Sequence, residues 1–316
     1  MNLFLQMFPA ALIMATPIVI AALGGLFSER SGIINIALEG IMLVGAFATA
    51  TATILLSDTF GNFAPWIAII VGAIIGCAYS AIHAFVSIHL KADQTISGVA
   101  LNMLSTGLTI YLCQLIFDGQ RTPNFPTNIA KVSVPFLKDI PLLGPMFFNN
   151  AYPTFFVAVA LVFITYFLMY KTRFGLRLRS CGEFPQASAS MGINVTKMRY
   201  IGVLTSGFLG GLSGGIMVLT TNIQFSVSVI HGVGFIALGC LVFGKWHPFG
   251  CLFTGVFFGF SEIISSYSGN IPGLSGLPTE FFYSVPYVLT IIALILFAKR
   301  SVGPKAAGKI YDAGQR

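Results

Sequence analysis

Charged residues are scarce in this sequence. They make up 9% of its 316 residues, whereas soluble domains carry about 25%. A chain with so few charges cannot cover an ordinary globular surface, so a soluble globular domain is excluded. Apolar sequence is abundant instead: 56% of the residues are hydrophobic, in runs near the length of about 20 residues that crosses a bilayer. The composition predicts an all-α domain, a bundle of helices that crosses the membrane many times.

Motifs for catalysis and metal binding are also missing. The five cysteines show no CxxC spacing, and neither an HExxH sequence nor a Ser/His/Asp set occurs. We therefore expect no catalytic residues, no metal site and no cofactor bound by this chain. The run from Gly239 to Trp246 approaches the phosphate-binding loop pattern, but Trp246 occupies the Ser/Thr position that should reach magnesium. The chain is predicted to be unable to hydrolyse ATP itself.

No Lys or Arg precedes Arg30, so the basic start of a cleavable signal peptide is missing and the first apolar run is predicted to be a retained span. Hydrophobic patterning predicts about eight to ten spans in all. Nine are placed at residues 7–27, 33–56, 65–89, 96–117, 151–170, 198–219, 229–244, 248–265 and 279–298. The seventh is short for a full crossing and is a candidate re-entrant or broken helix.

Basic residues divide unevenly between the predicted loops. If residues 171–197 lie in the cytoplasm, fourteen of the seventeen Lys and Arg residues lie inside and three outside, as the positive-inside rule requires. The N-terminus is then outside and the C-terminus inside. Residues 1–316 are predicted to form a single membrane domain, with an extracytoplasmic loop at 118–150, a cytoplasmic loop at 171–197 and a solvated cytoplasmic tail at 299–316. The net charge of +7 is assigned to these loops, not to nucleic-acid binding.

The turn between the first two spans carries a charged motif, Ser28–Gly40. Asn35 and Glu39 are four residues apart in it, so they share one face of a helix. A carboxylate at membrane depth costs about 2.5–3.5 kcal/mol on insertion scales, so Glu39 must face protein or water. Both residues are candidates for a solute pathway or gate. A structural cap, or a partner for Arg30, is the alternative.

Polar residues form a stripe on the fourth span. Asn102, Ser105 and Thr109 lie on it at i, i+3 and i+7, and they are further candidates for lining the solute pathway. Hydrogen bonding between helices is the alternative.

Glycines recur every four residues in the sixth span, at Gly207, Gly211 and Gly215. Small residues at this spacing let helix backbones approach closely. The pattern predicts helix packing, either within the subunit or against a second one.

The 171–197 loop contains a predicted short helix from Pro185 to Gly192, because Pro favours a helix start and Gly follows a helix end.

Four segments of the chain resemble a known family. They are ERSGIINIALEG at 29–40, ISGVALN at 96–102, GEFPQASASMGINV at 182–195 and GVGFIAL at 232–238. Over about residues 15–298 the chain resembles permease subunits of bacterial ABC importers for nucleosides and simple sugars, the branched-chain-type family. Lys245–Pro248 departs from the family's more usual turn of small residues and proline, and could alter the inner gate or a partner contact.

The resemblance implies partners and a location. Two permease subunits, this one and a longer relative, form a heterodimer with the solute pathway between them. A cytoplasmic ABC ATPase that holds ATP and Mg²⁺ grips the 171–197 loop, and an extracytoplasmic substrate-binding lipoprotein delivers the solute. The assembly lies among the lipids of the bacterial cytoplasmic (inner) membrane. The coupling residues implied in this chain are Glu183, Pro185, Ala187, Ala189, Gly192 and Asn194.

The polarity of the predicted pathway indicates the kind of solute. A pathway of modest polarity suits a neutral, partly aromatic solute such as a nucleoside. Riboflavin or a simple sugar is an alternative within the same class. An ion-coupled secondary transporter, which would act alone and without ATP, is the alternative outside it.

Overall fold

The structure is a computed structural model that describes residues 2–133, 144–149, 151–267 and 303–312, with the single residues 135, 140, 284, 288 and 291. The ninth predicted span, at 279–298, lies outside this description apart from three of those single residues.

The described residues confirm the prediction of an all-α fold. Their one extended pairing is an isolated bridge between Val132 and Ala151. The helices are α1 (Asn2–Arg30), α2 (Leu38–Phe60), η1 (Gly61–Phe63), α3 (Ala64–Ile88), α4 (Gln94–Phe117), η2 (Gly144–Phe148), α5 (Pro153–Lys171), α6 (Arg173–Glu183), α7 (Pro185–Ser190), α8 (Val195–Thr221), η3 (Val227–Val229), α9 (Val233–Phe243) and α10 (Pro248–Tyr267).

Five apolar helical runs in the described part of the chain are long enough to cross a membrane. One of them, Leu38–Ile88, has 51 residues and would be about 77 Å long if straight, more than twice a hydrocarbon core of about 30 Å. It is instead a hairpin, because the chain turns at Gly61, where φ is 51°, and α3 packs back along α2. With α9 and α10, these runs account for eight of the nine predicted spans, and the chain is a multi-pass membrane protein.

The second predicted span begins too early. It was placed from residue 33, whereas α2 begins at Leu38. Gly32 has a φ of 99°, in the left-handed region that glycine enters without steric cost. The Ser28 hydroxyl also donates to the carbonyl oxygen of Ile33 at 2.7 Å, which holds the turn open. We call residues 29–39, where the chain passes from α1 into α2, the α1–α2 joint.

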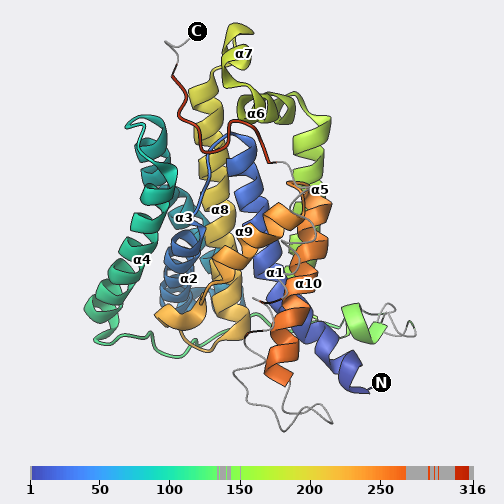
Figure 1. The fold of residues 1–316 in the computed structure, drawn as a ribbon. Coiled ribbons are helices and arrows are strands. Elements are labelled where there is room, and N and C mark those ends of the chain that lie inside the picture. Colours follow the sequence, from blue (N-terminus) through green and yellow to red (C-terminus); the bar gives the residue numbers. More distant parts are fainter. Residues whose placement is uncertain are drawn as a thin grey trace.

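The seventh predicted span is broken, as its length suggested. It consists of the 3-10 turn η3 followed by α9, which has 11 residues and is therefore only about 16 Å long. Such a helix cannot cross a bilayer by itself. In Figure 1 it runs obliquely between the longer helices.

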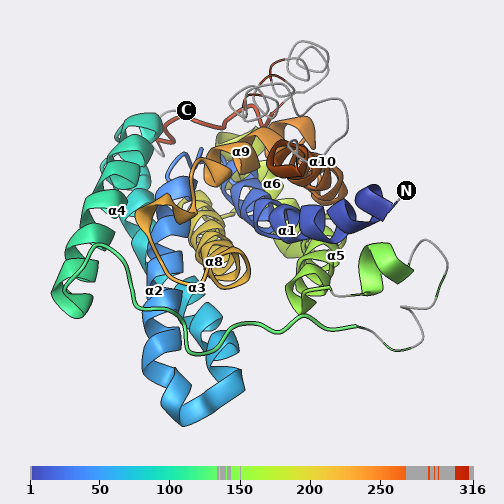
Figure 2. The same ribbon diagram turned by 90° about the horizontal axis from the view of Figure 1, so that it is seen from below.

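Helix α8 forms the centre of the bundle. Figure 2 shows it enclosed by α1, α2, α3 and α9, and it packs on α1, α2 and α3. Its glycines allow this: a Cβ atom on Gly207 would overlap Ser80, one on Gly211 would overlap the carbonyl oxygen of Gly72, and one on Gly215 would overlap Thr49. The three glycines of α8 therefore pack against α2 and α3 of the same subunit.

One end of the bundle gathers loops that are distant in sequence. Arg30 lies 3.8 Å from Glu183 at the end of α6, and Lys91 lies 3.2 Å from Asp312 in the C-terminal segment. Figure 1 shows α6, α7 and the C-terminal segment together there, with the N-terminus at the opposite end. We call this the α6–α7 end. The loops that the sequence predicts on one side of the membrane thus meet at one end of the fold.

Replacing Gly211 with alanine should destabilise the bundle, because the new Cβ atom meets the backbone of α3, which cannot move aside. Overpacking of this kind costs about 1–3 kcal/mol, so the melting temperature of the purified chain in detergent should fall. Gly107→Ala in α4 is the matched control, because nothing lies within 4 Å of its Cβ position. Helix propensity should then hold or slightly raise its melting temperature. Equal melting temperatures for the two variants would contradict this packing.

Candidate functional site

Glu39 binds the start of the broken helix. Its Oε1 accepts a hydrogen bond from the amide of Gly232 at 2.6 Å, and its Oε2 accepts one from the amide of Gly234 at 2.7 Å. The first amides of a helix have no partners within the helix and carry a partial positive charge. A carboxylate that accepts two of them anchors α9 to α2. Glu39 is thus a cap, on a helix other than its own.

The two glycines make this contact possible. Gly232 has a φ of 84°, and a Cβ atom on Gly234 would lie 2.6 Å from the Cα atom of Glu39. Any larger residue at Gly234 would push α9 away from α2. Sequence reasoning noted both glycines only as part of a family segment. Two signals could have paired Glu39 with these glycines. One is a carboxylate in an apolar span, which needs hydrogen-bond donors; the other is a pair of glycines at the start of a short helix.

Asn35 is the second candidate in the joint, and it is fully buried. Its Nδ2 donates to the Ser206 hydroxyl of α8 at 2.9 Å, whereas its Oδ1 has no hydrogen-bond partner among the described residues. The side chain therefore ties the joint to the central helix.

The polar stripe of α4 also faces the joint. Asn102 accepts from the amide of Gly40 at 2.8 Å and donates to the carbonyl oxygen of Ile36 at 3.0 Å. Ser105 and Thr109 are buried, and each hydroxyl donates to a carbonyl of its own helix. The structure thus brings Asn35, Glu39 and Asn102 to one joint, while Ser105 and Thr109 continue along the inner face of α4. Whether any of the five touches solute stays a prediction.

The 171–197 loop is more helical than the sequence suggested. The predicted short helix is α7, which begins at Pro185 and ends at Ser190, shortly before Gly192 with its φ of 78°. Asn194 caps α8, accepting from the amide of Lys197 at 2.8 Å. Helix α6 was not predicted, although Thr172 caps its start. We call residues 173–194 the α6–α7 segment.

The inner side of the α6–α7 segment is packed, and its outer side is open. Cys181 of α6 is fully buried, and this burial raises the pKa of its thiol. On the outside, Phe184 and Met191 are 59% and 82% exposed. With Ala187 and Ile193 they line a shallow groove of about 290 Å³. Exposed apolar side chains grouped in this way are typical of a protein-binding surface.

The C-terminal segment packs against this end of the bundle, so the prediction of a fully solvated tail was wrong for residues 303–312. The amide of Ala306 donates to the carbonyl oxygen of Gly182 at 2.8 Å, and Arg199 donates to the carbonyl oxygen of Lys309 at 3.2 Å. Backbone contacts of this kind between distant segments leave no pattern in the sequence.

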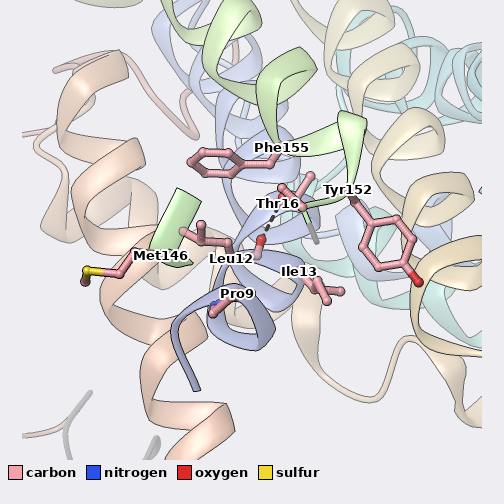
Figure 3. A pocket seen from close by; sticks show the side chains of 8 residues that line it. Pro9, Leu12, Ile13, Thr16, Met146, Tyr152 and Phe155 are labelled. Carbon is pink, nitrogen blue, oxygen red and sulfur yellow. Dashed lines mark hydrogen bonds between the residues drawn. The ribbon is translucent and has the colours of Figure 1, made fainter. Parts of the chain in front are cut away.

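A cavity of about 10 Å³ lies near the opposite end of the bundle, between α1, η2 and α5 (Figure 3). The Thr16 hydroxyl at its wall donates to the carbonyl oxygen of Leu12 in its own helix at 2.7 Å, so this polar group is already satisfied within α1. The space suits at most one water molecule. It is a packing gap, lined by Pro9, Leu12, Ile13, Thr16, Met146, Ala151, Tyr152 and Phe155.

A multi-pass bundle of apolar helices, with a short broken helix anchored by a buried carboxylate and an exposed apolar segment at one end, is typical of a membrane permease. The chain belongs to the family described as branched-chain amino acid transport system / permease component, whose model matches residues 7–294.

Two relatives bear this out, and a solved structure shares the fold. The chain is 46% identical to the guanosine ABC transporter permease protein NupQ of Bacillus subtilis, over 98% of this chain and 97% of NupQ. It is 42% identical to the nucleoside ABC transporter permease protein NupC of Lactococcus lactis, over 95% and 94%. A solved structure, described as an inward-facing conformation of a metal-chelate type ABC transporter, shares the fold with a TM-score of 0.51 and 14% identity over 92% of this chain and 85% of that one.

Glu39→Gln should loosen the start of α9. A glutamine amide has one acceptor oxygen, so either Gly232 or Gly234 loses its partner, and losing a hydrogen bond to a charged acceptor costs about 1.5–3 kcal/mol. Hydrogen exchange of the amides at 232–236, measured by mass spectrometry, should speed up by tenfold or more. Asp118→Asn is the control: it also removes a carboxylate, at an exposed position with a φ of 54° that asparagine tolerates. Unchanged exchange at 232–236 in Glu39→Gln would refute the anchor.

Proposed function

We propose that this chain is the permease subunit of an ATP-driven ABC importer for nucleosides. The observation that carries the proposal is the 46% identity to a guanosine permease protein, which extends over 98% of this chain and so over nearly the whole bundle. This chain contributes to the solute pathway and does not hydrolyse ATP. ATP and Mg²⁺ are held by a separate ATPase, whose hydrolysis cycle alternates access to the solute.

The α6–α7 segment is the proposed docking site for that ATPase. Its groove presents Phe184 and Met191 to the outside, with the charged Glu183 at the rim. An apolar centre with a charged rim is the usual composition of a protein interface. Pro185, Ala187, Ala189, Gly192 and Asn194 shape this surface, as the family resemblance implies.

The α6–α7 end is proposed to face the cytoplasm. The basic loops meet there, and the positive-inside rule favours such loops on the cytoplasmic side of the bacterial inner membrane. The N-terminus then lies outside, where a substrate-binding lipoprotein would deliver the solute.

A second, longer permease is proposed to complete the pathway. Large apolar side chains are exposed along three helices, among them Ile74 of α3, Met103 of α4 and Phe167 of α5. In a membrane protein such a surface meets either lipid or another subunit. The solute pathway would lie between the two permeases, so one chain alone carries half of it.

Met191→Glu should abolish association with the ATPase, because it puts a carboxylate that must be desolvated into the apolar groove. The ATPase should no longer co-purify with the permease, while the melting temperature of the permease stays the same. Ile223→Glu is the matched control, since Ile223 is 62% exposed and lies at the opposite end of the bundle. Retention of the ATPase by the Met191 variant would place the docking surface elsewhere.

Proteoliposomes that contain this chain, a second permease, the ATPase and the binding lipoprotein should take up labelled guanosine only when ATP is supplied on the ATPase side. Unlabelled nucleosides should compete, whereas glucose and riboflavin should not. Competition by glucose alone would assign the chain to a sugar importer. Uptake by the lone chain without ATP would make it a secondary transporter.

A further inference from the structure

The turn between α9 and α10 is held by the end of α1. The indole Nε1 of Trp246 donates to Oε2 of Glu29 at 2.6 Å, and both side chains are buried. Arg30 donates to the carbonyl oxygen of Trp246 through Nη2 at 3.0 Å and Nε at 3.3 Å. Two consecutive residues of α1 thus bind one residue of the turn, by its side chain and by its backbone.

The turn is strained and depends on these contacts. Lys245 and Trp246 have φ values of 53° and 50°, in the left-handed region that residues with a Cβ atom avoid. Such a conformation persists where surrounding contacts over-determine it. The sequence singled out Lys245–Pro248 as a departure from the family pattern, and the turn it forms fits the Glu29 and Arg30 side chains.

The same turn is connected twice to the α6–α7 segment. Arg30 forms an ion pair with Glu183, at 3.8 Å, directly before α7. The second connection runs through α5: the Arg179 guanidinium lies 4.6 Å from the centre of the Tyr170 ring, and the Tyr170 hydroxyl lies 3.5 Å from the carbonyl oxygen of Trp246. A displacement of α6 therefore reaches the same atom of Trp246 by two routes.

The turn and the start of α10 pack tightly against α9. A Cβ atom on Gly250 would overlap Gly244, and Thr254 of α10 donates to the carbonyl oxygen of Cys240 at 3.0 Å. At its other end α9 is held by Glu39. The α1–α2 joint therefore binds α9 at both ends. Glu39 binds its start, and Glu29 and Arg30 bind the turn that follows it.

We propose that Glu29, Arg30 and Trp246 form a clamp that passes movement of the α6–α7 segment to α9, and so couples ATP hydrolysis to the opening of the pathway. This inference rests on the proposed ATPase docking and deepens it. The three side chains are positioning residues: they need not touch the solute. They make the position of α9 depend on the position of the α6–α7 segment, which the ATPase binds.

Two conservative substitutions weaken the clamp. Trp246→Phe removes the indole N–H and keeps an aromatic ring. Arg30→Lys keeps the charge but loses the planar group that reaches both Trp246 and Glu183. In the reconstituted complex each should lower the number of solute molecules transported per ATP hydrolysed about tenfold, a typical size for coupling between sites, while ATPase association is unchanged. Ser213→Ala is the control, because it removes another buried interhelical hydrogen bond, 2.6 Å to the carbonyl oxygen of Pro17, away from the clamp.

A ratio of transport to hydrolysis equal to that of the unmodified complex would overturn the clamp, even if both rates fell together. Loss of ATPase association in the clamp variants would overturn it as well, because the exposed groove is left intact.

A distance measurement separates this inference from the identity of the solute. Spin labels on Lys245→Cys in the turn after α9 and on Ile74→Cys in α3, both exposed, report movement of that turn when a non-hydrolysable ATP analogue binds. Cys77→Ser removes the half-buried native thiol, and the other four native cysteines are buried. We expect a nucleotide-dependent shift in the intact complex that disappears in Trp246→Phe. A shift that persists in the variant refutes the clamp. A shift in a complex that takes up no nucleoside refutes the proposed solute and leaves the clamp standing.

Discussion

The structure depends on one constraint: between α1 and α2 the backbone of the α1–α2 joint is not helical, so its amides and carbonyls lack partners within a helix. A non-helical stretch in a membrane domain must find partners for its amides and carbonyls within the protein. The amide of Ile34 donates to Gln94 at 2.8 Å, and its carbonyl oxygen accepts from Nε2 of His83 at 3.0 Å. The carbonyl oxygen of Ile36 accepts from Asn102. These partners belong to α3 and α4, so satisfying the joint also fixes where those helices stand.

The side chains of the joint also fix the positions of other helices in the bundle. Asn35 reaches α8, Glu39 reaches the start of α9, and Glu29 and Arg30 reach the turn after α9. A helix of 11 residues that cannot span the bilayer is thereby held at both ends. This explains why a carboxylate at membrane depth is tolerated: the helix start supplies its donors. A short helix held at its ends, and linked to the proposed ATPase docking surface by the proposed clamp, is a suitable moving part for alternating access.

The sequence predicted what depends on periodicity and composition. The all-α class, the spans, the broken seventh span and the short helix at Pro185 follow from apolar runs, glycine and proline, which act locally. Helix α6 was missed, although the N-cap Thr172 and the buried Leu178 and Cys181 on one face give it a local signal.

Contacts between distant segments could not be predicted. Glu39 and Gly232 are 193 residues apart, and no spacing rule pairs them. The same holds for Trp246 with Glu29, and for Ala306 with Gly182. The sequence therefore singled out Glu39 but left open what it binds, because a carboxylate that caps one helix and a carboxylate that lines a pathway look the same in a sequence.

The most direct measurement is a pair of cryo-EM structures of the assembled transporter, one without nucleotide and one with ATP bound to a hydrolysis-deficient ATPase. We predict that α7, the turn at Trp246 and the C-terminal end of α9 shift together relative to α3 and α8, while the start of α9 stays bonded to Glu39 through Gly232 and Gly234 in both states. If α7 moves with the ATPase while α9 and its turn keep their places, the joint does not transmit motion and the account is wrong.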